Sequence, residues 1–289
     1  MQLESLLRRE QIDADTLRSL QGWEENGILM LSIPGKQAHE IWNRLVNRTP
    51  TVGYYPVVTT TVNVDLLTRD RKVDSVAAAR DDALEHARQI TFDGWLTQQR
   101  DPSYQVAKYL RMAEQVERYP GGELLAKINR DIADNWRNRP AWRFDPASCP
   151  WPDEPVQVRP ADQLCCVHSG YENVTAETAA ILFVPTADPC EVPAHLLFGG
   201  FNSCPPPEVH VAMLRSMQTR YQARLLVIDC GTIEIVVSHR PASRQEALRL
   251  ATDFHTYAES FEGTAYNKQS AGHIAAYLLA SDYWAFWWD

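Results

Sequence analysis

Residues able to do covalent chemistry gather in residues 199–207, which read GGFNSCPPP. Cys204 could act as a nucleophile near the start of a helix, because a neighbouring base or positive charge stabilises a thiolate. His195 and His210 lie on either side of it and are the two candidate bases. With Asn202 as a polar neighbour, these residues define one hypothesis: an enzyme with a Cys204-centred catalytic site in a cleft between the two halves of the chain.

The three prolines after Cys204 favour a different interpretation of the same segment. A residue that precedes proline is pushed into an extended conformation, so the next helix begins no earlier than Pro207. Three polyproline-like residues span roughly 9 Å. Because the dipole of a helix acts mainly within its first turn, Cys204 lies too far from the helix for the dipole to stabilise its thiolate. We therefore expect a rigid loop in which glycines supply positive φ, Asn202 bonds its own backbone and Cys204 packs as a core thiol. The loop residues are Gly199, Gly200, Asn202, Pro205 and Pro206.

Cys165, Cys166 and His168 form a second cluster with metal-ligating side chains. On a strand, Cys166 and His168 would share one face and Cys165 would lie on the other. A structural metal site needs about four ligands, and no second cluster offers them at a recognisable spacing. The sequence therefore predicts no metal site, no cofactor, and reduced, mostly buried thiols.

The chain ends in an aromatic run, residues 283–289, YWAFWWD. Alternation along a strand puts Trp284, Phe286 and Trp288 on one face, with Tyr283 and Trp287 on the other. Exposed aromatic rings of this size are costly, so each face needs a cover. Packing against residues 1–140 is the favoured explanation, and a partner-binding surface formed by Trp284, Trp287 and Trp288 is the alternative.

Charge and hydropathy exclude several classes of protein. The net charge is −9, from 28 basic and 37 acidic residues, and no basic patch marks a nucleic-acid surface. An acidic chain could instead attract a basic protein partner. No window is apolar enough to span a membrane, and the charged N-terminus lacks a signal peptide, so we expect a cytoplasmic protein without a membrane partner. The sequence contains no P-loop, dinucleotide fingerprint, G-x-S-x-G or H-E-x-x-H motif.

The pattern of apolar residues predicts an α+β fold in two parts, 1–150 and 151–289. The first part begins as β-α-β, with strands near 28–33 and 51–64 around a helix over 36–46, and continues as a helical lobe with helices over 75–90, 102–119 and 123–136. A proline-dense stretch, 139–160, marks the boundary. The second part has the order β-α-β-β-α-(α)-β of a ferredoxin-like unit. Its strands are predicted over 164–168, 179–185, 225–229, 232–238 and 283–288, and its helices over 207–221, after Ser243 and over 272–280.

Three segments carry a resemblance to a known family: PAHLLFGGFNSCPPPEVH (193–210), Arg240-Pro241 with the EALRLA that follows, and the terminal YWAFWWD. Together they resemble the uncharacterised bacterial family named domain of unknown function 4253, over about residues 179–289. Members of that family typically show a GGxNxCPPPxxH-like stretch and end on WWD. This chain departs from the pattern at Tyr257-Ala258-Glu259-Ser260, where the family has a Cys-Pro-Asp-like element. The resemblance implies no reaction, because the family has no established activity.

Taken together, the sequence favours binding over catalysis. We expect a protein-binding module that acts as an immunity or inhibitor protein and blocks a cognate basic toxin or enzyme. The Cys204-centred enzyme and a purely structural, oligomerising domain are the alternatives.

Overall fold

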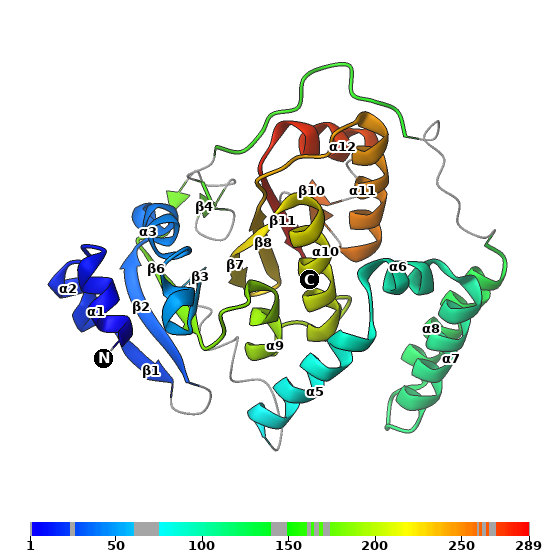
Figure 1. The fold of residues 1–289 in the computed structure, drawn as a ribbon. Coiled ribbons are helices and arrows are strands. Elements are labelled where there is room, and N and C mark those ends of the chain that lie inside the picture. Colours follow the sequence, from blue (N-terminus) through cyan, green and yellow to red (C-terminus); the bar gives the residue numbers. More distant parts are fainter. Residues whose placement is uncertain are drawn as a thin grey trace. The chain divides into compact units, whose positions relative to one another are not determined.

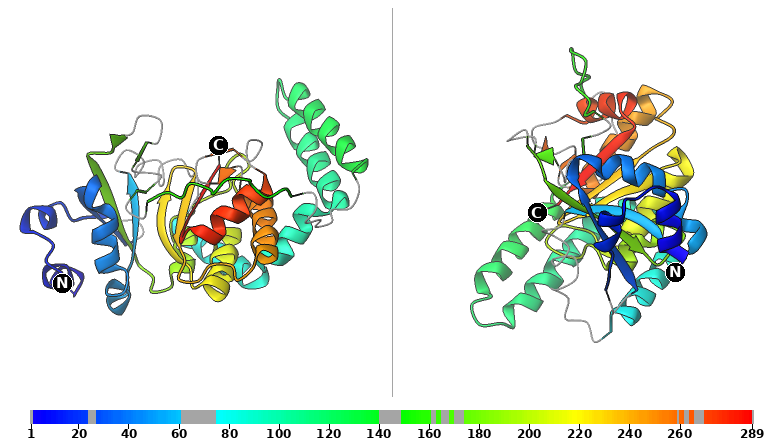
Figure 2. Two further views of the ribbon diagram at one scale, coloured as in Figure 1. Left: turned by 90° about the horizontal axis from the view of Figure 1, so that it is seen from above. Right: turned by 90° about the vertical axis from the view of Figure 1, so that its left-hand side faces the viewer.

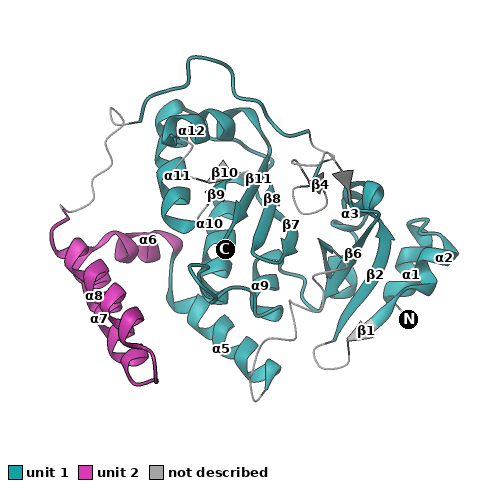
Figure 3. Cartoon of the chain, turned by 180° about the vertical axis from the view of Figure 1, so that it is seen from behind, with its two compact units in different colours: residues 1–91, 149–289 teal, residues 92–148 magenta. Residues whose placement is uncertain are grey.

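The computed structural model describes residues 2–23, 27–60, 75–139, 149–160, 163–164, 168–169, 174–258, 260–261, 264–265 and 270–288. The chain forms two compact units (Figure 3). The first, here the sheet unit, contains Met1–Thr91 and Cys149–Asp289, and the second, here the helical unit, contains Phe92–Ser148. The sheet unit therefore joins residues 1–91 to the C-terminal segment, and the helical unit lies between them in the sequence.

In the described residues, the sheet unit is built on a nine-stranded sheet (Figure 1). β3 (Tyr55–Thr60) and β7 (Arg224–Asp229) pair in parallel, and the other neighbouring strands pair antiparallel. A separate pair is formed by β4 (His168–Ser169) and β5 (Val174–Thr175). Across the large sheet the order is β1 (Gln21–Trp23), β2 (Ile28–Pro34), β6 (Thr178–Val184), β3 (Tyr55–Thr60), β7 (Arg224–Asp229), β8 (Thr232–Val236), β11 (Tyr283–Trp287), β9 (Ser260–Phe261) and β10 (Thr264–Ala265).

The fold class is α+β, as predicted, but the order of the described strands does not confirm the ferredoxin-like arrangement. In that arrangement the first strand of the C-terminal half would pair with other strands of the same half. Here β6 pairs with β2 and β3, and β3 lies between β6 and β7. The reason is the continuous apolar run of β6, which is buried on both faces and has to form hydrogen bonds along both edges. The apolar strands of residues 28–60 supply those edges.

Helices cover both faces of the sheet (Figures 1 and 2). α10 (Pro207–Tyr221) and α11 (Arg244–Tyr257) pack on one face, where the ring of Phe254 lies 4.7 Å from Phe286 and the ring of Tyr221 lies 5.4 Å from Trp284. α12 (Ala271–Ala280) packs against α11. On the opposite face, His39 of α3 (Ala38–Leu45) lies 3.0 Å from the hydroxyl of Tyr283. The N-terminal part therefore contacts the face of β11 that bears Tyr283.

Local signals set the ends of several helices. Asp13 caps α2 (Ala14–Arg18) by accepting hydrogen bonds from the amides of Asp15 and Thr16. Ser243 caps α11 by accepting a hydrogen bond from the amide of Glu246. The remaining helices of the sheet unit include α1 (Gln2–Arg9), α5 (Val76–Gln89) and α9 (Val192–His195). None of the described helices is both long and apolar enough to cross a membrane.

The helical unit contains α6 (Phe92–Arg100), α7 (Pro102–Glu117) and α8 (Glu123–Arg137). α7 and α8 match two of the predicted helices, whereas α6 was not predicted. α7 and α8 pack against each other as an antiparallel pair, and the buried residues on them include the small side chains of Ala113, Ala126 and Ala133. The ion pair between Arg130 and Glu117 joins the two helices along one side.

The described part of the proline-dense stretch, residues 149–160, packs on the sheet unit. Arg159 forms a buried ion pair with Glu234 of β8 at 2.9 Å, and its amide donates to the hydroxyl of Tyr277 on α12. A Cβ on Gly272 would lie 1.9 Å from the carbonyl oxygen of Pro150, so residues 149–160 approach α12 more closely than any residue other than glycine would permit.

Candidate functional site

The loop that carries Cys204 has the left-handed backbone that its glycines predict. The φ angles of Gly199, Gly200 and Asn202 are 101°, 77° and 43°. The Gly200 amide donates to the carbonyl of Pro205 at 2.9 Å, and the Cys204 amide donates to the carbonyl of Phe201 at 2.8 Å. α10 begins at Pro207, as the proline argument predicts. The loop is therefore tied back on itself directly before the helix.

Cys204 and His210 meet at the start of α10. The Cys204 Sγ lies 3.4 Å from Nε2 of His210, and Nδ1 of His210 lies 2.6 Å from the hydroxyl of Tyr257 at the end of α11. Helical side chains tilt toward the helix N-terminus, so a histidine in the first turn points back at the preceding loop. His210 is one of the two candidate bases that the sequence offers for Cys204, and the structure places it in contact with the thiol.

Aromatic rings enclose the imidazole of His210. The ring centroids of Phe198 and Trp288 each lie 5.1 Å from it, and that of Tyr257 lies 5.6 Å away. The indole nitrogen of Trp288 donates to the carbonyl of Tyr257 at 2.9 Å, which ties the chain end to α11. His210, Tyr257 and Trp288 are buried, and Cys204 is 5% exposed.

Gly199 makes room for this cluster. A Cβ at this position would lie 2.0 Å from the carbonyl oxygen of Pro205 and 2.6 Å from Nε2 of His210. Any larger residue would therefore have to move either the loop or the imidazole.

This arrangement can transfer a proton between sulfur and nitrogen. A neutral imidazole has one donor nitrogen and one acceptor nitrogen. When Nδ1–H donates to the Tyr257 oxygen, Nε2 is the acceptor and can take the proton of Cys204. A nucleophile, a base in contact with it and a third group that orients the base form the arrangement of nucleophilic catalysis.

The other residues of the predicted enzyme site are not part of this contact. His195 is buried on α9, and burial lowers its pKa to about 4, with a smaller contribution from Arg80 of α5. Asn202 lies in the loop with an exposed side chain. Of the two predicted bases, His210 is the one whose contact with Cys204 the structure gives.

The predicted partner-binding surface of Trp284, Trp287 and Trp288 is wrong for two of its three residues. Trp284 and Trp288 are buried in the core, whereas Trp287 on the opposite face of β11 is 40% exposed. The alternation follows the sequence pattern, but the face that bears Trp284 and Trp288 is covered by α10 and α11. A partner can therefore reach only Trp287 of these three side chains.

The cluster of Cys165, Cys166 and His168 falls mostly outside the described residues. Cys165 and Cys166 lie outside the described residues, and His168 belongs to β4. Among the residues that the structure describes, no group of three or more potential ligands is close enough to hold a metal ion. Cys190 and Cys230 are free thiols.

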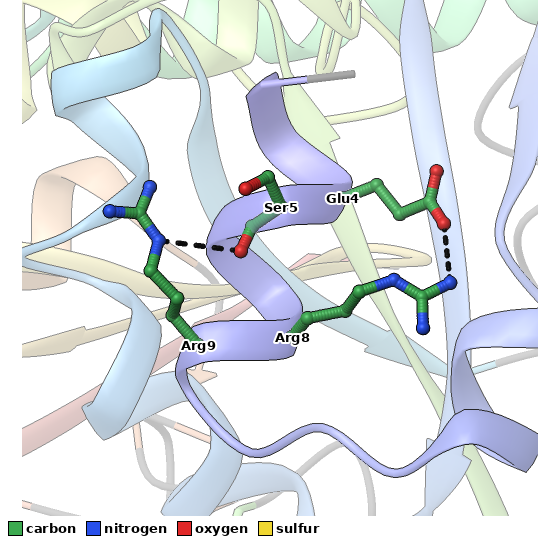
Figure 4. A pocket seen from close by; sticks show the side chains of 4 residues that line it. All are labelled: Glu4, Ser5, Arg8 and Arg9. Atoms are coloured by element: carbon green, nitrogen blue, oxygen red, sulfur yellow. Dashed lines mark hydrogen bonds and ion pairs between the residues drawn. The ribbon is translucent and has the colours of Figure 1, made fainter.

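A surface depression on α1 offers no comparable chemistry (Figure 4). It is lined by Glu4, Ser5, Arg8 and Arg9, all from a single helix. Arg8 pairs with Glu4 at 2.7 Å, and this hydrogen bond lowers the pKa of the Glu4 carboxyl group. Two paired, exposed charges on one helix are an ordinary surface feature.

Tyr257 is not among the site residues that the sequence predicts. It lies 47 residues from His210, and no motif spacing joins two residues on different helices at that separation. The available signal was its apolar spacing on α11, which correctly predicts that it faces inward but gives no partner for its hydroxyl.

Comparisons with known proteins identify one relationship. A search of curated proteins gives no match. No solved structure matches the chain either. Residues 180–289, which contain Cys204, His210, Tyr257 and Trp288, match the model of the family described as domain of unknown function (DUF4253), the family that the sequence resembles.

Proposed function

We propose that the protein is a thiol-dependent enzyme in which Cys204 is the nucleophile and His210 the base. The observation that carries this proposal is the line of contacts from Cys204 Sγ to His210 Nε2 at 3.4 Å and from His210 Nδ1 to the Tyr257 hydroxyl at 2.6 Å. The hydroxyl holds the imidazole in one orientation, and the rings of Phe198 and Trp288 shield it from water.

The reaction class that suits these groups is acyl transfer. His210 takes the thiol proton, and the sulfur of Cys204 forms a bond to the substrate carbonyl carbon. The proton passes from His210 to the leaving group as the acyl–leaving-group bond breaks. Water, deprotonated by His210, then cleaves the thioester and restores the thiol.

Access to Cys204 depends on the loop above it. The side chains of Phe201, Asn202 and Ser203 are exposed, and the loop is closed by the backbone hydrogen bonds from Gly200 and Cys204. The two glycines tolerate large changes in φ, so the loop can open without strain in an ordinary residue. Substrate entry by this displacement is part of the proposal.

Alkylation of the native protein tests whether Cys204 is activated. The full chain is treated with iodoacetamide over a range of pH, and each cysteine is followed by peptide mass spectrometry. We expect Cys204 to react with a midpoint below the ordinary thiol pKa of about 8.5. Cys190 and Cys230 are internal controls, since burial raises the pKa of both thiols and acidic neighbours raise it further.

Two variants separate activation from exposure. His210→Gln should move the alkylation midpoint of Cys204 upward, and Tyr257→Phe should move it less, because it removes only the group that orients the ring. If Cys204 is alkylated only after denaturation, or if its midpoint is the same in His210→Gln, the thiol is a core residue and the proposal fails.

Protein binding is a second candidate, favoured by the distribution of charge. α7 and α8 together carry five basic and five acidic residues, so the remaining 23 basic and 32 acidic residues give the rest of the chain the whole net charge of −9. Such a surface would favour capture of a basic toxin or enzyme by an inhibitor or immunity protein. We place either activity in the cytoplasm, where thiols remain reduced.

Affinity capture from the source cells at low and high salt tests this second function. We expect one stoichiometric basic partner at low salt, an enzymatic activity of that partner that is lost in the complex, and release at high salt. Absence of a partner at both salt concentrations, or a captured protein that keeps its full activity, would contradict it.

A further inference from the structure

The helical unit exposes an apolar stripe along α8. Spacings of three and four residues place Leu125, Ile128, Ile132 and Trp136, here the α8 stripe, on one side of the helix. Leu125 is 55% exposed and Ile128 is 44% exposed, and the other two are partly buried. At the C-terminal end of the stripe, the guanidinium of Arg139 lies over the ring of Trp136, 4.4 Å from its centroid.

The charged residues of the hairpin lie elsewhere on its surface. Arg130 comes five residues after Leu125, which is about 140° around the helix at 3.6 residues per turn. On α7, exposed Met112 and Glu117 are separated by the same interval. Because Arg130 pairs with Glu117, this ion pair marks the charged side of the hairpin, and the α8 stripe and Met112 lie away from it.

Two helices cannot bury a stripe of this width between themselves. α7 and α8 cover each other with Ala113, Ala126 and Ala133, so the larger apolar residues are left beside the contact rather than in it. A second pair of helices laid on that side would complete a four-helix bundle.

From these observations we infer that the helical unit pairs with a second copy of itself through the α8 stripe, in a two-fold symmetric dimer. The charge distribution selects this occupant. The two helices have no net charge and the stripe contains no charged side chain, so like copies do not repel one another there. A strongly basic partner would gain nothing from this surface. A copy of the hairpin presents an apolar face of equal length, and two-fold dimers are the commonest closed assemblies.

The dimensions of the two helices limit the area that the dimer can bury. Helices of 15 and 16 residues at 1.5 Å per residue are about 23 Å long, and two side by side are about 20 Å wide. The face therefore covers roughly 450 Å² per copy and roughly 900 Å² in total, below the 1,200–2,000 Å² of stable complexes. We expect a reversible dimer that forms with rising concentration.

The salt dependence distinguishes this dimer from capture of a basic protein. Each copy carries a charge of −9 outside the two helices, so the rest of each chain opposes the dimer, and added salt screens this repulsion. Self-association should therefore strengthen with salt, whereas binding of a basic partner should weaken.

Sedimentation velocity of the full chain tests the inference, from about 1 to about 300 µM protein at about 50 and 500 mM salt. The wild-type protein should shift from monomer to dimer, and more so at high salt. The double variant Leu125→Gln, Ile128→Gln should raise the dissociation constant at least about tenfold. Both residues are exposed and glutamine is a good helix former, so the hairpin should keep its helicity, which circular dichroism checks.

Tyr119→Ser is the matched control. Tyr119 is 70% exposed in the turn between the helices, so the change removes a large apolar side chain that is not in the stripe. It should leave the dissociation constant unchanged. A wild-type protein that stays monomeric at all concentrations and both salts overturns the inference, as does a dimer that the double variant leaves intact.

Discussion

Replacing Gly199 with alanine measures how tightly the loop is fitted against His210. The new Cβ would lie 2.0 Å from the Pro205 carbonyl oxygen and 2.6 Å from His210 Nε2, in a backbone with φ at 101°. Both atoms have to retreat by about 1 Å or more to reach ordinary contact, and overpacking of this kind costs about 1–3 kcal/mol. The positive φ adds about 1–2 kcal/mol for a residue that has a Cβ.

Gly53→Ala provides the matched control for backbone strain. Gly53 has φ of 84° in the same unit, and nothing lies within 4 Å of the position of its Cβ. In Gly53→Ala, only backbone strain should lower the free energy of unfolding. Part of that loss is offset because alanine has fewer conformations than glycine in the unfolded chain, which is worth about 0.4–1 kcal/mol. We expect Gly199→Ala to be the less stable variant by about 1–3 kcal/mol.

Urea unfolding followed by tryptophan fluorescence measures this difference, since buried Trp42, Trp284 and Trp288 all report on the sheet unit. The alkylation midpoint of Cys204 gives an independent readout of whether the imidazole has moved. Equal free energies of unfolding for the two variants would show that the loop does not press on His210, and would refute the close fit.

Three further predictions concern the same unit. Trp288→Ala should lower the free energy of unfolding by about 3–5 kcal/mol, and Trp287→Ala by much less, because only the first ring is buried; equal losses in urea unfolding would contradict the burial pattern. The pKa of His195 falls from 6.5 to about 4 on burial, so between these values the unfolded state binds more protons. Stability should therefore decline as pH falls from about 6.5 to about 4, and His195→Leu should flatten that decline. Tyr55→Phe should cost about 1–3 kcal/mol, because it leaves the buried carbonyl of Leu225 without the hydroxyl that now donates to it at 2.8 Å; unchanged thermal unfolding would contradict this.

Local chemistry in the sequence predicts much of the local structure. The start of α10 at Pro207 follows from the restrictions that prolines place on their predecessors, and β6 follows from its uninterrupted apolar run. The positive φ of Gly199 and Gly200 follows from residue type. Each of these depends on neighbours within a few residues.

The arrangement of these elements was harder to predict, because it depends on contacts between distant segments. The insertion of β3 beside β6 is set by which strand best pairs with a doubly buried edge, and no local pattern identifies it. The contact between His210 and Tyr257 joins two helices whose separate apolar patterns say nothing about hydroxyl partners. For the same reason, the sequence predicts the helices over 207–221 and after Ser243 but not that they cover the face of β11 that bears Trp284 and Trp288.

The place of β3 in the sheet has a consequence for how this chain can be divided. The segment that matches the family model contains β7 and nearly all of β6, but the strand between them comes from residues 55–60. Cutting the chain at residue 180 would leave two inner strands with unpaired amides and carbonyls facing an empty slot, which is a template for pairing between molecules. In this protein the boundary of the shared family segment is therefore not a boundary of folding. The first sixty residues complete a sheet that the family segment begins, and a truncated form made for crystallisation or display should retain them.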